Sequence, residues 1–114
     1  MSNINIIFVG INTNYDMRIV ARSTLVVYYT ENPQAKSALE DWYEKTRHAE
    51  WSNYADMKKT FNSVNAVGNQ HYVFNIKGND DCLVVVVQFT PHRVYIRFIG
   101  THSEYDKIED IKNI

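Results

Sequence analysis

The stretch HYVFNIKGNDDCLVVVVQFTPHRVYIRFI, residues 71–99, decides the fold. It contains three runs, 71–77, 82–89 and 94–99, that are rich in β-branched and aromatic residues and alternate with a period of two. Gly-Asn-Asp-Asp and Thr-Pro-His-Arg separate the runs, and both are four-residue connections made of turn-forming residues. The sequence therefore predicts three consecutive antiparallel strands joined by hairpins.

The predicted register places Lys77 opposite Cys82 and Phe89 opposite Val94. Because side chains alternate between the faces of a sheet, this register gathers large apolar residues on one face, which we expect to pack against helices: Tyr72, Phe74, Ile76, Leu83, Val85, Val87, Phe89, Val94, Ile96 and Phe98. The opposite face is mixed and carries His71, Val73, Asn75, Lys77, Cys82, Val84, Val86, Gln88, Tyr95, Arg97 and Ile99.

The residues before this sheet predict one short strand and two or three helices. The strand is expected over 18–21, and a first helix runs from Ser23 to a stop at Asn32-Pro33. A second, stronger helix begins at Pro33 and has one apolar stripe: Ala35, Leu39, Trp42, Tyr43 and Thr46. Ser52 is expected to cap a third helical segment, which presents on one side Tyr54, Met57, Lys58 and Phe61.

The predicted fold class is therefore α+β. Residues 62–69 are interpreted as a loop, and a short helical tail is expected from about Ser103. The expected order is β-α-α-(α)-β-β-β, with the antiparallel sheet packed on the N-terminal helices.

Length and composition indicate one globular domain without a metal or a disulfide. The chain has 114 residues, of which 45% are hydrophobic, enough to bury a core. Its single cysteine cannot form an internal bridge, and no cluster has metal-ligand spacing, so we expect a reducing cytoplasm and no cofactor. The longest apolar run, 83–87, is too short to span a bilayer, which argues against a membrane role. The net charge of −1 argues mildly against nucleic acid, so any RNA-binding surface must be local.

The first sixteen residues differ from the rest and suggest a boundary. Residues 1–16 contain one charge and read as a hydrophobic stretch followed by turn-forming residues. Met17 stands directly before the predicted strand, so translation could begin there, with 17–114 as the domain and 1–16 as an extension. An edge strand over 5–9 is the competing interpretation, and the sequence leaves both open.

Candidate chemistry gathers at the end of the predicted sheet. Arg97 and Lys77 lie on one sheet face, where phosphates of single-stranded RNA could bind. His102 can exchange a proton near neutral pH, and Tyr105 could orient a base or donate a proton. Each residue also has a plainer interpretation, as an exposed arginine, a hairpin-end lysine, a structural histidine or a packing tyrosine.

Two signatures carry a resemblance to a known family. They are YVFNIKGN (72–79) and VYIRFIGTHSEYDKI (94–108), preceded by the shorter ALEDWY (38–43) and AEW (49–51). In this order and at this separation they resemble the HigB family of toxins, within the RelE superfamily, and the similarity spans residue 17 to the end.

The resemblance implies a RelE-like fold and ribosome-dependent, metal-free cleavage of mRNA by an endoribonuclease. It also implies neutralisation by a HigA-type helix-turn-helix antitoxin, through which the toxin would be linked indirectly to operator DNA. The residues carried over as catalytic are His102, Arg97, Lys77 and Tyr105, and those expected to bind RNA are Lys77, Arg97, Asn75 and His71.

Two departures from the family pattern support an alternative function. Cys82 stands before the Leu-Val-Val run where family members often have an arginine, and the chain is slightly acidic where such toxins tend to be basic. A catalytically degenerate protein that only binds antitoxin and acts as a co-repressor module would fit both features. A plain structural or interaction domain is a further alternative.

Overall fold

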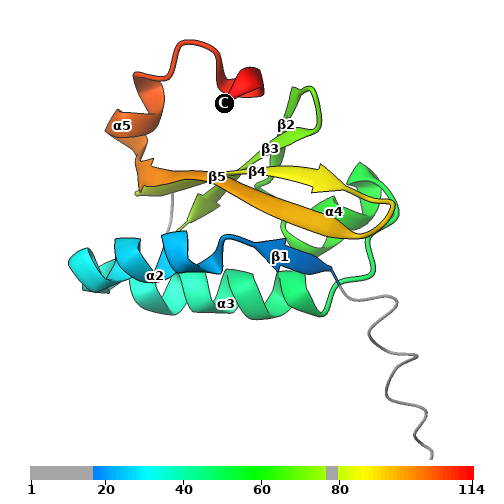
Figure 1. The fold of residues 1–114 in the computed structure, drawn as a ribbon, viewed down its shortest axis with the longest axis horizontal. Helices are drawn as coiled ribbons and strands as arrows, with labels where there is room; N and C mark the ends of the chain where they lie inside the picture. Colours follow the sequence, from blue (N-terminus) through cyan, green and yellow to red (C-terminus); the bar gives the residue numbers. More distant parts are fainter. Residues whose placement is uncertain (1–16, 77–79) are drawn as a thin grey trace, which may run out of the picture.

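A five-stranded sheet organises the molecule (Figure 1). The computed structural model describes residues 17–76 and 80–114, and its strands are ordered β1-β5-β4-β3-β2. β1 runs parallel to β5, and the other neighbouring strands are antiparallel. The strands are β1 (Arg18–Val20), β2 (Asn65–Gly68), β3 (His71–Ile76), β4 (Asp81–Gln88) and β5 (Arg93–Thr101).

Helices lie on both sides of this sheet. In Figure 1, α2 and α3 run below the sheet, whereas α5 and the C-terminal segment lie above it. The helical elements are α2 (Arg22–Glu31), the 3-10 turn η1 (Pro33–Ala35), α3 (Lys36–Arg47), α4 (Tyr54–Thr60), α5 (His102–Asp106) and the 3-10 turn η2 (Ile111–Asn113). The predicted α+β class, the helical layer and the helical tail are confirmed.

The apolar stripe of α3 forms the centre of the main core. Leu39, Trp42 and Thr46 are fully buried, and the Trp42 ring meets Phe74 of β3 edge to face at 5.5 Å between centroids. Such a pair adds packing specificity to the burial of two large rings. Met17, the first described residue, also belongs to this core and is only 2% exposed. Residues 1–16, including the possible strand over 5–9, lie outside the described residues.

Two predictions between the helices and the sheet were wrong. Asn53, not Ser52, caps α4, since its side chain accepts the backbone N–H of Asp56 at 3.0 Å. Residues 65–68, predicted as loop, form β2, which pairs with the first half of β3. The segment, Asn-Ala-Val-Gly, is short and has no alternation of large apolar residues, so its pairing depends on the neighbouring strand rather than on a pattern of its own.

The predicted strand register was also wrong, by two residues at each hairpin. Cys82 pairs with Asn75 instead of Lys77, and Val94 pairs with Val87 instead of Phe89. A slip of two residues leaves every side chain on its original face, because the side-chain period is two. The predicted faces therefore hold over most of the sheet.

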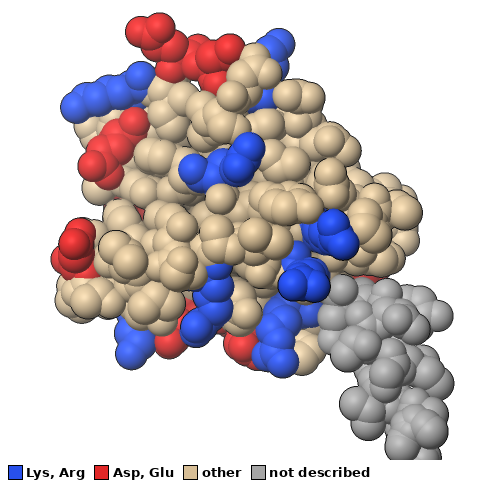
Figure 2. Space-filling view, in the orientation of Figure 1, with Lys and Arg blue, Asp and Glu red and all other residues tan. Residues whose placement is uncertain are grey.

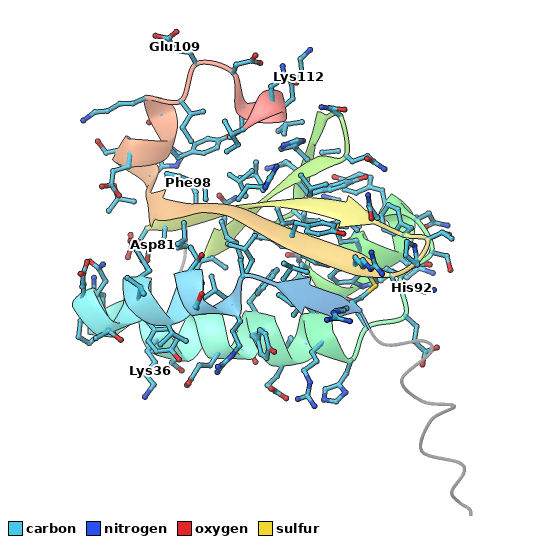
Figure 3. All side chains as sticks on the ribbon, in the orientation of Figure 1. Lys36, Asp81, His92, Phe98, Glu109 and Lys112 are labelled. Atoms are coloured by element: carbon cyan, nitrogen blue, oxygen red, sulfur yellow. The ribbon has the colours of Figure 1, made fainter. Side chains whose placement is uncertain are left out.

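A β-bulge reverses the faces at the end of β5. Val85 pairs with Ile96 but Val84 pairs with Phe98, so Arg97 is an extra residue in β5. Beyond the bulge, Ile99 joins the core on the helix side, whereas Phe98 packs in a second cluster on the opposite face. Figure 3 shows Phe98 on the side of β5 that faces the C-terminal tail. The predicted positions of these two residues were thus interchanged.

The C-terminal tail covers one end of this second face. Its residues Tyr105, Ile111 and Ile114 pack on a small buried cluster made of Val73, Cys82 and Val84. Over the rest of the described part of the face, β4 and β5 present side chains to solvent. No helix in the described part is long and apolar enough to cross a membrane.

Candidate active site

Arg97 lies at the bulge in β5, on the face that the alternation from Tyr95 already gives it. Bulges re-aim side chains and are common beside active sites. The guanidinium is exposed and borders an open hollow on the tail side of the sheet. It makes no ion pair or hydrogen bond with any described residue, so its donors are free to bind an anion such as a phosphate.

His102 is positioned by the junction between β5 and α5. Thr101 and Glu104 form a reciprocal capping box, in which the Thr101 hydroxyl accepts the Glu104 N–H at 3.1 Å and Glu104 accepts the Thr101 N–H at 2.8 Å. The strand therefore ends sharply, and His102 is the first residue of the helix. The backbone N–H of His102 also donates to the carbonyl of Asp80 at 3.1 Å, which ties the helix start to the beginning of β4.

One ring nitrogen of His102 contacts the thiol of a cysteine. Its Nδ1 lies 3.2 Å from Sγ of Cys82, a fully buried residue of β4. Burial raises the pKa of the Cys82 thiol, with a smaller contribution from Asp106 and Asp81, so the group is an uncharged S–H at neutral pH. A thiol can donate weakly to a bare Nδ1 or accept weakly from Nδ1–H. In either tautomer Nε2 is the nitrogen left for chemistry.

Nε2 of His102 faces a carboxylate and solvent. It lies 3.7 Å from Oδ1 of Asp106, and the histidine side chain is 47% exposed. Solvent screens this exposed contact. Arg97 lies on the same sheet face, five residues before His102, which corresponds to at most about 16 Å between their Cα atoms in an extended strand.

Tyr105 stacks on the imidazole of His102. The ring centroids are 6.0 Å apart at an interplanar angle of 24°. Burial raises the pKa of Tyr105, with smaller contributions from Cys82 and Asp106, so the phenol remains protonated at neutral pH and can donate a hydrogen bond. The stacked pair presents two flat rings at the edge of the sheet.

The remaining predicted site residues lie in different surroundings. Asn75 joins the His102 group, since its Oδ1 lies 3.9 Å from Sγ of Cys82. Lys77 falls outside the described residues. His71 is only 5% exposed, and its ring nitrogens lie 2.7 Å and 3.2 Å from the carbonyl oxygens of Asn69 and Ile114. Both ring nitrogens thus contact main-chain oxygens, one of them in the C-terminal tail, and RNA binding by His71 stays a prediction.

Cys82 is the site residue that the sequence interpretation missed. We interpreted it only as a departure from a family pattern that could reduce activity. The alternation of the strand already placed it on the same face as Asn75 and Arg97, which was the available signal. Its contact with His102 depends on how α5 folds back over β4, and no local pattern indicates that.

Charge is distributed unevenly over the molecule. Asp81 is the only acidic residue in the described strands, and it faces α2, where its Oδ1 accepts the Tyr28 hydroxyl at 2.6 Å. Figure 2 shows several basic side chains from the middle to the lower right, whereas acidic side chains lie mainly along the top and left margins, where basic side chains accompany them. A local basic surface thus exists in spite of the net charge of −1. Within 17–76 and 80–114, no group of three or more His, Cys, Asp or Glu residues could hold a metal ion.

Comparisons with known proteins identify the family of this chain. Residues 35–108 match the family model of the HigB toxin, described as the RelE-like toxic component of a toxin-antitoxin system. The chain is 23% identical over 94 residues to "mRNA interferase HigB" of Escherichia coli O6:H1, covering 81% of this chain and 91% of that relative. It is 47% identical over 38 residues to "mRNA interferase toxin HigB" of Escherichia coli K12, covering 33% of this chain and 36% of that relative.

The family match includes β3, β4, β5 and α5, and so contains Arg97, His102 and Tyr105. The sheet packed on helices is the RelE-like architecture that the sequence predicted. The chain therefore belongs to the HigB family of toxins, the RelE-like toxic components of toxin-antitoxin systems.

Proposed function

We propose that this toxin is an endoribonuclease that cuts mRNA on the translating ribosome, using side chains and no metal. The observation that carries the proposal is the arrangement around His102. The exposed imidazole of His102 contacts Cys82 through one nitrogen, stacks on Tyr105 and turns its other nitrogen toward Asp106 and solvent. Arg97, which is unpaired among the described residues, lies on the same sheet face. The relatives named mRNA interferases support the same activity.

The reaction requires one proton to move between two oxygens. The ribose 2′-oxygen attacks the adjacent phosphorus, a new P–O2′ bond forms, and the P–O5′ bond breaks. Nε2 of His102 would take the proton of the 2′-hydroxyl and return it to the departing 5′-oxygen, leaving a cyclic phosphate and a 5′-hydroxyl. During this cycle Nδ1–H would donate to Sγ of Cys82, and Asp106 would stabilise the transient imidazolium.

Arg97 and Lys77 would stabilise the negative charge that gathers on the phosphate in the transition state. The stacked Tyr105 would keep the imidazole plane fixed and offer a donor. Asn75 would contact the RNA near the same end of the sheet. The partners that we propose are mRNA on the ribosome in the cytoplasm and a HigA-type antitoxin, with operator DNA reached through the antitoxin.

Expression without the antitoxin tests the activity. Induction in a bacterial host should arrest growth and fragment mRNA, and His102→Ala or Arg97→Ala should relieve both effects. Arg47→Ala is the matched control, because Arg47 is an exposed arginine on α3, in the opposite layer, paired with Glu44 at 3.3 Å. It should remain toxic.

The same experiment distinguishes the enzyme from the catalytically degenerate alternative. Normal growth and intact mRNA, with wild-type protein that is folded and binds antitoxin, would support a binding module and contradict the enzyme. No specific contact in the site favours that alternative.

A further inference from the structure

The part of the sheet that the tail leaves uncovered contains a hollow of about 300 Å³. It is lined by Val86 and Gln88 of β4 and by Tyr95 and Arg97 of β5. Apolar and aromatic side chains with a few convergent polar groups are the usual lining of a ligand site. The hollow lies on the same face of the sheet as the His102 group, but it shares only Arg97 with the proposed catalytic residues.

The polar groups that line the hollow have no partners among the described residues. The side chains of Gln88, Tyr95 and Arg97 make no hydrogen bond, ion pair or ring contact with any described residue. On a surface without a binding role, the amide of Gln88, the phenol of Tyr95 and the guanidinium of Arg97 could hydrogen-bond to one another or to carboxylates. Here their donors and acceptors remain available to a ligand.

Two further arginines lie at the border of the hollow. β1 pairs in parallel with β5, and in this register Arg18 lies beside Arg93 and Val20 beside Tyr95. Partners in a sheet point to the same face, so both arginines share the face of Tyr95. Arg18 and Arg93 are exposed and form no ion pair with any described residue. By contrast, Lys45 and Arg47 on α3 are paired with carboxylates at 3.0 Å and 3.3 Å.

We infer that this hollow is a nucleotide-binding subsite, which takes one unstacked base of single-stranded RNA while Arg18 and Arg93 hold the flanking phosphates. The inference rests on the proposed function and names a second contact region for the same substrate. Tyr95 provides a flat partner for the base, and the Gln88 amide can donate to and accept from a base edge. The absence of any acid on this face within the described strands suits a polyanion.

Binding is measured with a short, labelled, 2′-fluoro single-stranded RNA, which lacks the attacking hydroxyl, by fluorescence anisotropy at several salt concentrations. Tyr95→Ala should weaken binding by about 5-fold to 150-fold, the loss expected for one stacked base. Arg18→Gln and Arg93→Gln should each lower the slope of log K against log salt by about 0.7, the value for one phosphate contact on a single strand. Gln88→Leu should change the order of the binding affinities for different homopolymeric RNAs.

Arg47→Gln serves as the matched control, and circular dichroism verifies that each variant is folded. If Tyr95→Ala, Arg18→Gln and Arg93→Gln all bind like the wild type while the wild type still cuts mRNA, the subsite is refuted and the proposed function stands. If the wild type neither binds nor cuts RNA, the proposed function itself fails. A Tyr95→Phe variant that binds like the wild type would support stacking over a role of the hydroxyl.

Discussion

The hydrogen bond between Tyr28 and Asp81 fixes the end of the sheet that holds the site. Asp81 is only 3% exposed, and the Tyr28 hydroxyl at 2.6 Å is the single side-chain partner of its carboxylate among the described residues. Figure 3 shows Asp81 between the sheet and α2. The next residue in β4 is Cys82, which contacts His102. Loss of this bond should therefore affect both stability and the site.

Tyr28→Phe removes the donor and leaves a buried carboxylate without its partner. A hydrogen bond to a charged group contributes about 1.5–3 kcal/mol, so we expect the free energy of unfolding to fall by about 2 kcal/mol. In a domain of this size, that loss lowers the Tm by about 8–16 °C. Urea titration followed by circular dichroism measures the change, and differential scanning calorimetry gives the Tm.

Tyr29→Phe is the control on the same helix. Its hydroxyl lies 3.5 Å from Glu40 in an exposed contact, so its removal should cost less than about 0.5 kcal/mol. Equal losses in the two variants, or no loss in Tyr28→Phe, would refute the idea that the buried Asp81 contact holds α2 to the sheet.

Three other predictions concern stability and reactivity. Because burial raises the pKa of the Cys82 thiol, native protein at pH 8 should react slowly with a thiol reagent such as DTNB. Unfolding in urea should make the reaction fast, and fast labelling of the native protein would contradict the prediction. Asn53→Ala should destabilise α4 by about 1 kcal/mol in urea titrations, whereas Ser52→Ala should have little effect, and equal effects would contradict the Asn53 cap. Burial and the bond to Asp81 raise the pKa of Tyr28, so its contribution to stability is complete below the ordinary tyrosine pKa of 10.0 and is lost as pH rises above it. Unfolding free energies from pH 8 to 12 should therefore fall less steeply in Tyr28→Phe than in the wild type.

The sequence predicted the layers of the fold because they follow from patterns that repeat along the chain. The apolar stripe of α3 does not depend on strand register, and the alternation of the strands gives the same faces when the register is wrong by two residues. The helix-facing side of the sheet was therefore predicted correctly for Phe74, Leu83 and Val94. The loop predicted over 65–68 was wrong because β2 has no apolar alternation of its own and forms only against β3.

The bulge in β5 could not be predicted by the same reasoning. One extra residue in β5 changes the parity of all that follows, and nothing in the local sequence around Arg97 signals it. The bulge leaves Arg97 on its predicted face and moves Phe98 to the tail side. Cys82 could not be predicted as the partner of His102, because this contact depends on how the chain turns after Thr101. A capping box there starts α5, which brings His102 to Cys82.

The most direct test of the proposed activity uses a reconstituted translation mixture with one defined mRNA, mapped by primer extension with and without ribosomes. Wild-type protein should produce cuts only on mRNA that is being translated, and folded His102→Ala protein should produce none. Cuts of equal intensity by His102→Ala, or intact mRNA in the presence of folded wild-type protein, would contradict the assignment of His102 as the group that moves the proton.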